Sequence, residues 1–458
     1  MLFHIILREL RSNILSLRML LALVLALTVF GLGTLVFVAN YKIDRKEIEH
    51  SSQQEIERMK AAAAESVSSL ANWGFNQDFG PRSNSFISNS REDNLPVRFM
   101  YDSFKVDRFF VWPGRNPLSD SCQPLDWMFI VSIIISFSVL LLAYDTVSGE
   151  KEARTLALSL SNPVSRGLVL FGKYVSVILS TILVLVPGMA LSLLIILSSG
   201  RIAITRGTLA ETGLFLAAAI LFVACITAFG ILTSVLTHRA NVSLVAALSL
   251  WLLFVVVVPN TALYWAQKLF PIERMENVMQ RINMERENLE KGMPEGWRKN
   301  SASLVENYAK LENEFLASEM KVRRDWYNQM FSQYERTRLI TALSPIAIFE
   351  YLCEAAVGGG YLRFRKNWRD MNSFQLQFLE FVKAADAKDP ESPHAFSPNS
   401  WGISGKPVDF SDVLIFQEKA PSIQERFSHA GLYLLILFFY TTAAFALSFV
   451  LFVRYDVR

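Results

Sequence analysis

Charged residues are scarce in this chain of 458 residues, at 19% of the sequence, and there are only three cysteines. The net charge of +3 is small, and no lysine or arginine run concentrates it, which argues against nucleic acid as a partner. The cysteines, at 122, 225 and 353, lack metal-ligand spacing. Cys225 is predicted to be a core residue of an apolar stretch. The sequence leaves open whether Cys122 and Cys353 form a disulfide.

Catalytic motifs are lacking as well. The five histidines are scattered without an HExxH pattern, and neither a GxSxG elbow nor a kinase-type loop occurs. Gly167 to Lys173 nearly spells a phosphate-binding loop, but Tyr174 stands where Ser or Thr should bind magnesium, and no strand precedes it. We therefore expect no catalytic residue, metal site or nucleotide site. Lys173 is predicted at the inner interface with its ammonium reaching toward water.

Long apolar runs are what the chain has instead, since 52% of its residues are hydrophobic. A bilayer core takes about 20 helical residues, and six runs reach that scale: 19–39, 127–144, 168–198, 211–237, 241–264 and 430–453. The first run has no clear cleavage site, which favours a retained anchor over a signal peptide. The predicted fold is an all-α membrane protein. The spans contain almost no ionisable residues, so we expect the energy source outside this chain.

Arginine and lysine beside the spans predict the orientation. With the amino terminus in the cytoplasm, nine basic residues flank the spans inside and two lie in the short outer loop. The inside set is Arg8, Arg11, Arg18, Lys151, Arg154, Arg166, Arg239, Arg454 and Arg458, and the outside set is Arg201 and Arg206. Both termini are then cytoplasmic in a multi-pass protein of the inner membrane. Residues 1–18 are predicted to form an amphipathic helix on the membrane surface.

Two segments, 40–126 and 265–429, are predicted to face outward. The first should continue span one as a helix and then form loops with a few short strands. The second keeps heptad spacing on both sides of a turn signal at 292–296, which predicts a coiled-coil-like helical hairpin. Its charged faces are either solvated surface or a docking arm for an extracytoplasmic partner. Residues 344–360, too short for a span, are predicted as a helix at or dipping into the outer interface.

The loop at 145–167 lies between spans two and three and is rich in charge. Apolar residues at three- and four-residue spacing, from Ala153 to Leu160, predict a short amphipathic helix. Asn162 and Pro163 then end it. A helix held at the membrane surface between two spans is suited to receive force from a soluble partner.

This run, from Tyr144-Asp145-Thr146 through Ser161-Asn162-Pro163, with Gly172-Lys173 further on, resembles the permease subunits of type-2 ABC exporters. The likeness is closest to the branch of the nitrous oxide reductase maturation and gliding-motility permeases. It implies that the loop at 145–167 docks a separate ATPase, which binds ATP and magnesium, and that a second permease, identical or related, completes the path. The residues implied in coupling are Asp145, Gly149, Glu150, Lys151, Glu152, Arg154, Thr155, Leu156, Leu160, Pro163 and Arg166.

Other functions stay open beside the exporter. The ATPase cycle could instead drive the outer hairpin against an extracytoplasmic partner, which would make the chain a mechanotransmitter. A membrane scaffold would have partners but no ATPase. An integral membrane enzyme is disfavoured because no polar cluster is in view. The sequence does not identify the substrate.

Overall fold

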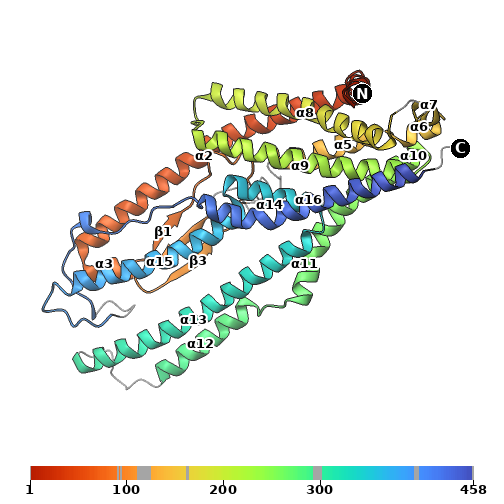
Figure 1. The fold of residues 1–458 in the computed structure, drawn as a ribbon. Helices are drawn as coiled ribbons and strands as arrows, with labels where there is room; N and C mark the ends of the chain where they lie inside the picture. Colours follow the sequence, from red (N-terminus) through yellow and green to blue (C-terminus); the bar gives the residue numbers. More distant parts are fainter. Residues whose placement is uncertain are drawn as a thin grey trace.

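The computed structural model describes residues 2–89, 92, 95–110, 125–160, 164–291, 302–396 and 402–455, and helices dominate it (Figure 1). Six helical stretches are long and apolar enough to cross a membrane, which agrees with the predicted number of spans. They are α2 (Leu17–Glu65), a broken stretch over Trp127–Glu152, α8 (Arg166–Ser199), α9 (Arg206–Leu236), a second broken stretch over Ala240–Leu269, and α16 (Ile423–Arg454).

Helix α9 lies at the centre of this bundle. It packs against α16, α8, α5 (Ser136–Ala143) and α10 (Ala240–Leu252). Gly230 allows the close approach to α5, because a Cβ there would lie 2.6 Å from the Cβ of Ala143. Phe215 and Phe222 are fully buried on α9, and Cys225 is buried there as predicted. Both termini lie at one end of the bundle (Figure 1), which we call the terminal end.

Two spans contain a π-helical turn, η2 (Ile130–Ile135) and η3 (Leu253–Val257). The second precedes Pro259, at the start of α11 (Val258–Leu269). Proline gives no N–H to the preceding turn, and a widened turn lets the helix continue past it. The carbonyl of Phe254 in that turn accepts a hydrogen bond from Ser344 Oγ at 2.7 Å. The span therefore continues past Pro259, and the widened turn before it holds another segment.

The two segments predicted to lie outside the membrane share one hydrophobic core. Helix α2 runs 49 residues, well past a bilayer thickness, and leads to α3 (Val67–Asn72). The amide of Val67 donates to the carbonyl of Lys406 at 2.9 Å, and that of Val408 donates to Ala63 at 2.8 Å. Residues more than 300 positions apart in the chain are thus joined by backbone hydrogen bonds. We call this unit the large domain.

A three-stranded antiparallel sheet lies in the first outward segment, where a few short strands were predicted, and it departs from the all-α fold class. Its strands are β1 (Phe75–Asp78), β2 (Arg98–Tyr101) and β3 (Val106–Phe110), in the order β1-β2-β3. Phe99 and Tyr101 point to one face of β2, as the two-residue period requires. Their rings meet Phe364 and Phe374 of α15 (Gly360–Asp386) at 6.2 and 5.3 Å. The aromatic residues of both segments therefore build the core together.

Helices α12 (Met275–Lys291) and α13 (Ala302–Thr341) run side by side as the arms of the predicted hairpin (Figure 1). Val278 and Ile282 of α12 are buried with Phe315 of α13. Arg286 occupies a heptad position at which the pattern predicts an apolar residue. Its guanidinium lies 4.9 Å from the centre of the Phe315 ring. The turn predicted at 292–296 lies outside the described residues.

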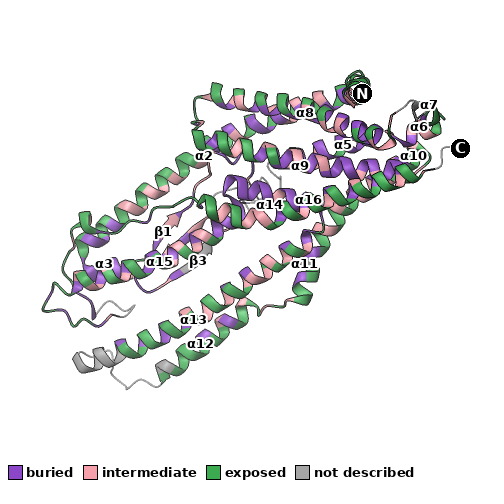
Figure 2. Ribbon diagram, viewed as in Figure 1, coloured by how far each residue is buried: buried purple, intermediate pink, exposed green. Residues whose placement is uncertain are grey.

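Helix α14 (Pro345–Val357) lies among the spans of the bundle. It packs between α9 and α16, and Phe349 stacks on Phe222 with ring centroids 4.6 Å apart. Figure 2 shows its residues buried along nearly the whole helix. Arg338 of α13 donates to Glu354 at 3.0 Å, and both side chains are buried. The predicted helix at 344–360 is thus an inserted part of the bundle. Cys353 is buried in it, whereas Cys122 lies outside the described residues.

Buried ion pairs join the large domain to the bundle at the end of α14. Glu92 accepts from Arg82 at 2.9 Å and from Arg363 at 3.1 Å. Arg82 also donates to the carbonyl of Val357, the last residue of α14, at 3.0 Å. Next to it, Arg426 at the start of α16 pairs with Glu211 of α9 at 2.9 Å. The domain and three helices of the bundle are therefore tied at one place.

Replacing Glu92 with Leu should destabilise this junction, because two buried guanidinium groups would lose a shared carboxylate. Breaking a buried pair from one side costs about 3–5 kcal/mol, so we expect a clear fall in the thermal unfolding midpoint in detergent. Glu49→Leu is the control, since Glu49 pairs with Arg45 while 57% exposed and such pairs contribute below about 1 kcal/mol. Equal midpoints for the two variants would contradict the role of the junction.

Candidate functional site

The segment predicted to couple with a partner lies at the terminal end of the bundle (Figure 1). It forms two short helices, α6 (Ser148–Glu152) and α7 (Leu156–Leu160), where one was predicted. Arg154 breaks them with a left-handed φ of 56°. The amide of Thr155 then donates to the carbonyl of Glu150 at 2.9 Å, which closes α6. The break turns α7 relative to α6, so a single helical period does not describe the segment.

Lys173 of α8 joins this segment to two other elements. Its ammonium lies 2.8 Å from Glu150 of α6 and 3.2 Å from Glu9 of α1 (Leu2–Ile14). The side chain is only 3% exposed. The prediction that Lys173 extends toward water is therefore wrong. An ammonium buried in an apolar bundle needs nearby carboxylates, and two are supplied here.

Lys151 and Glu152 fix the segment to the junction of α9 and α10. The Lys151 ammonium donates to the carbonyl of Val235 and, at 3.1 Å, to that of Thr237. A cation at the carboxyl end of α9 also opposes the negative end of the helix dipole. Glu152 accepts from the amide of Ala240, at the start of α10, at 2.8 Å. The two neighbouring charges thus bind the end of one span and the start of the next.

The first residues of the loop are held in the same way. Asp145 pairs with Arg18 of α2 at 2.7 Å, and Arg18 lies over the Tyr144 ring. Ser234 of α9 accepts from the buried amides of Val147 and Ser148 at 3.0 and 2.9 Å. Gly149 lies inside α6, and its amide donates to the Asp145 carbonyl. These contacts leave the loop little freedom to move apart from the spans.

Arg166, at the start of α8, reaches the end of α16. It donates to the carbonyls of Val453 and Tyr455 at 3.0 and 2.8 Å. The Tyr455 ring in turn lies 4.4 Å from the Lys151 ammonium. The predicted residues Asp145, Glu150, Lys151, Glu152 and Arg166 thus contact the bundle itself.

The outward side of the segment is formed by other residues. Leu156 is 3% exposed and belongs to the bundle core, whereas Leu158 is 73% exposed. Arg154, Thr155 and Ala157 are exposed beside Leu158. Nothing is described of the Leu160 side chain, and Pro163 lies outside the described residues. An apolar contact with a soluble partner would therefore be made by Leu158 and not by Leu156.

A family model for ABC-2 family transporter proteins matches residues 3–457, nearly the whole chain. The chain belongs to the ABC-2 transporter family. No curated protein matches it. Members of the family are membrane subunits that work with ABC ATPase partners, so the resemblance drawn from 145–167 holds at the level of the family.

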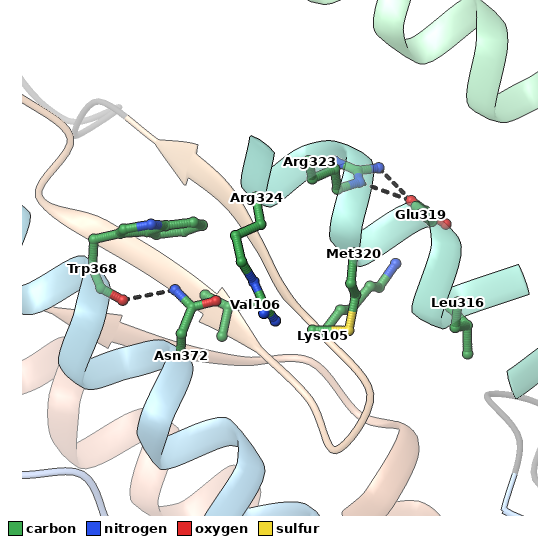
Figure 3. Close-up of a pocket in the computed structure, with 9 residues that line it drawn as sticks. All are labelled: Lys105, Val106, Leu316, Glu319, Met320, Arg323, Arg324, Trp368 and Asn372. Atoms are coloured by element: carbon green, nitrogen blue, oxygen red, sulfur yellow. Dashed lines mark hydrogen bonds and ion pairs between the residues drawn. The ribbon is translucent and has the colours of Figure 1, made fainter. Parts of the chain in front are cut away.

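Outside the segment at 145–167, the described residues of this ABC-2 protein form few groupings suited to catalysis or metal binding. Within the ranges described, no three His, Cys, Asp or Glu side chains gather as metal ligands. A hollow in the large domain is lined by residues of the β2–β3 turn, α13 and α15 (Figure 3). Trp368 forms one side of it and Arg324 reaches toward its centre, while Arg323 pairs with Glu319 at 2.6 Å. Among the described residues that line this hollow there is no histidine, cysteine or serine.

Three residues of the site were missed from the sequence: Glu9, Ser234 and Leu158. A signal existed for the first, because Glu9 is the one acidic residue in an otherwise apolar and basic amphipathic helix. Lys173 in the apolar run of α8 should have prompted the search for such a carboxylate. Nothing in the sequence marks Ser234 or Leu158 as a site residue, because each is indistinguishable in sequence from other serines or leucines at the ends of spans.

Replacing Ser234 with Ala should loosen the segment from α9, because two buried amides would lose their acceptor. An unsatisfied buried donor costs about 1–3 kcal/mol. We expect roughly tenfold faster amide hydrogen exchange over residues 145–156, measured by mass spectrometry of the purified protein. Ser198→Ala is the control, since the Ser198 hydroxyl is exposed and bonds only within α8. Unchanged exchange in Ser234→Ala would rule out this anchoring role.

Proposed function

We propose that this protein is the permease subunit of an ATP-driven exporter, with a separate ATPase docked on α6 and α7. One observation carries the proposal: charged groups of the segment hold the four helices α8, α9, α10 and α16, and a small face of Arg154, Thr155, Ala157 and Leu158 is directed outward. That face combines a cation with an apolar side chain, as docking surfaces do. In this account the terminal end is cytoplasmic and the membrane is the inner membrane.

The contacts of the segment supply a route for force. A push on α6 and α7 would reach α8 through Glu150 and Lys173, α9 through Lys151, and α10 through Glu152. Arg166 extends the same connection to α16. Closure of two ATPase subunits would therefore move the spans as near-rigid bodies around the path. ATP and magnesium belong to the partner chains in this account.

The fifth span supports a second permease in the complex. In its most apolar stretch 11% of the residues are buried, against 61% for the second and fourth spans. Val245, Leu252 and Val256 are among its exposed apolar residues. Six spans make half of a translocation path, and this uncovered helix is where a second permease, identical or related, would pack. Lipid would cover the remaining apolar surface.

A mechanotransmitter is the second candidate, and the buried junction favours it. Arg82 binds the end of α14, and Arg426 joins α16 to α9, so the large domain cannot move independently of these helices. ATP-driven motion of the spans would then swing α12 and α13 against an extracytoplasmic protein.

Leu158→Asp should abolish recruitment of the ATPase, because it places a carboxylate in the apolar part of the docking face. The variant should still fold and insert, since Leu158 is exposed. The measurement is copurification of an ATPase from cells that carry the neighbouring genes. Leu376→Asp on α15 is the control, because Leu376 is also an exposed leucine, at 54%, but lies in the large domain. Wild-type recruitment by Leu158→Asp would refute the docking face.

Labels on α13 and the bundle separate the two candidates. A mechanotransmitter should show an ATP-dependent change in energy transfer between a dye at Lys321 and one at Arg201, next to α8. A permease that only passes a substrate needs no such displacement of the hairpin. An unchanged distance through the ATPase cycle would therefore remove the second candidate and leave the first.

A further inference from the structure

Helix α1 presents three distinct stripes. At about 100° per residue, its inward stripe holds Leu2, Ile5, Ile6, Glu9 and Asn13. This stripe packs against α8: Asn13 donates to Ser180 at 3.1 Å, and a Cβ at Gly172 would lie 2.7 Å from Ile5. The helix is therefore seated on the third span along its whole length.

The other two stripes of α1 face away from the bundle. Phe3, Leu7 and Ile14 form an apolar stripe and are 67%, 44% and 46% exposed. Arg8 and Arg11 are exposed on the adjacent stripe, and neither has an ion pair within the described part of the chain. Apolar side chains beside cations, at the end of a membrane bundle, match the boundary between acyl chains and anionic headgroups.

The inward stripe also carries the link to the coupling segment. Glu9 binds the ammonium of Lys173, which binds Glu150 of α6 on its other side. Because Lys173 is 3% exposed, water does not screen the two pairs as it would on the surface. A shift of α1 would disturb Glu9, then Lys173, and then the first turn of α6.

We propose that α1 binds anionic phospholipid through Arg8, Arg11 and its apolar stripe. Lys173 is then the positioning residue that links the position of α1 to that of α6, through its ion pairs with Glu9 and Glu150. Each arginine near an anionic surface raises binding about fivefold. The consequence for ATPase coupling rests on the proposed function, but the lipid surface and the Lys173 link do not. Anionic lipid would then set how firmly the docking segment is held.

The lipid surface is tested with the full chain in nanodiscs of phosphatidylcholine, with or without phosphatidylglycerol. A nitroxide at Leu7→Cys, in a Cys122→Ser background, reports depth by its accessibility to oxygen and to a nickel chelate. We expect deeper insertion with phosphatidylglycerol, reversed by high salt and lost in the Arg8→Gln/Arg11→Gln variant. Lys321→Gln, on α13, should behave as wild type. Equal nitroxide depth with and without phosphatidylglycerol would overturn the proposal that α1 binds anionic lipid.

The link is tested by amide hydrogen exchange of residues 148–156 in the same nanodiscs. Phosphatidylglycerol should slow this exchange severalfold in the wild type and in Lys173→Arg, which keeps the cation. It should have no effect in Lys173→Met, although the nitroxide depth still responds to the lipid. A lipid effect that persists in Lys173→Met would overturn the link. Neither measurement needs the ATPase, so failure to recruit an ATPase counts against the proposed function alone.

Discussion

An ammonium or guanidinium enclosed in an apolar bundle must be paired, and this chain uses that requirement to join its parts. Lys173 holds Glu9 and Glu150 at the terminal end, where three elements meet. Arg82 and Arg363 share Glu92 at the other end, where the large domain meets the spans. Removing one partner of such a pair costs several kcal/mol, so neither junction separates readily. Buried charges therefore hold together the elements that meet at both of these places.

These two junctions define what can move. Between them the spans pack through apolar and small residues, such as Gly230 against Ala143, which permit sliding without the loss of a charged contact. In the proposed account, a push on α6 and α7 would be carried by polar contacts to four spans, and the large domain would follow the ends of α14 and α16. The same arrangement suits an exporter and a mechanotransmitter. In both, a movement driven by ATP at the terminal end has to be transmitted through the spans to the large domain.

The sequence predicted what depends on local pattern. Runs of about 20 apolar residues identify spans, whatever their neighbours are, and charge with helical spacing identified the segment at 145–167. It predicted short strands in 40–126 but not their pairing into a sheet or the shared core of the large domain, since the core requires strands and helices far apart in sequence to meet. The assignment of Leu156 to the partner surface assumed one helical period. The left-handed Arg154 broke that period and turned Leu158 outward in its place.

The most direct test is site-specific photocrosslinking in membranes that contain the complete transporter. A photoreactive amino acid at position 158 should crosslink to an ABC ATPase, whereas the same group at position 376 of the large domain should not. The account predicts a product with the mass of one permease plus one ATPase, formed only from position 158. An ATPase product from position 376, or none from position 158 while the ATPase copurifies, would contradict it.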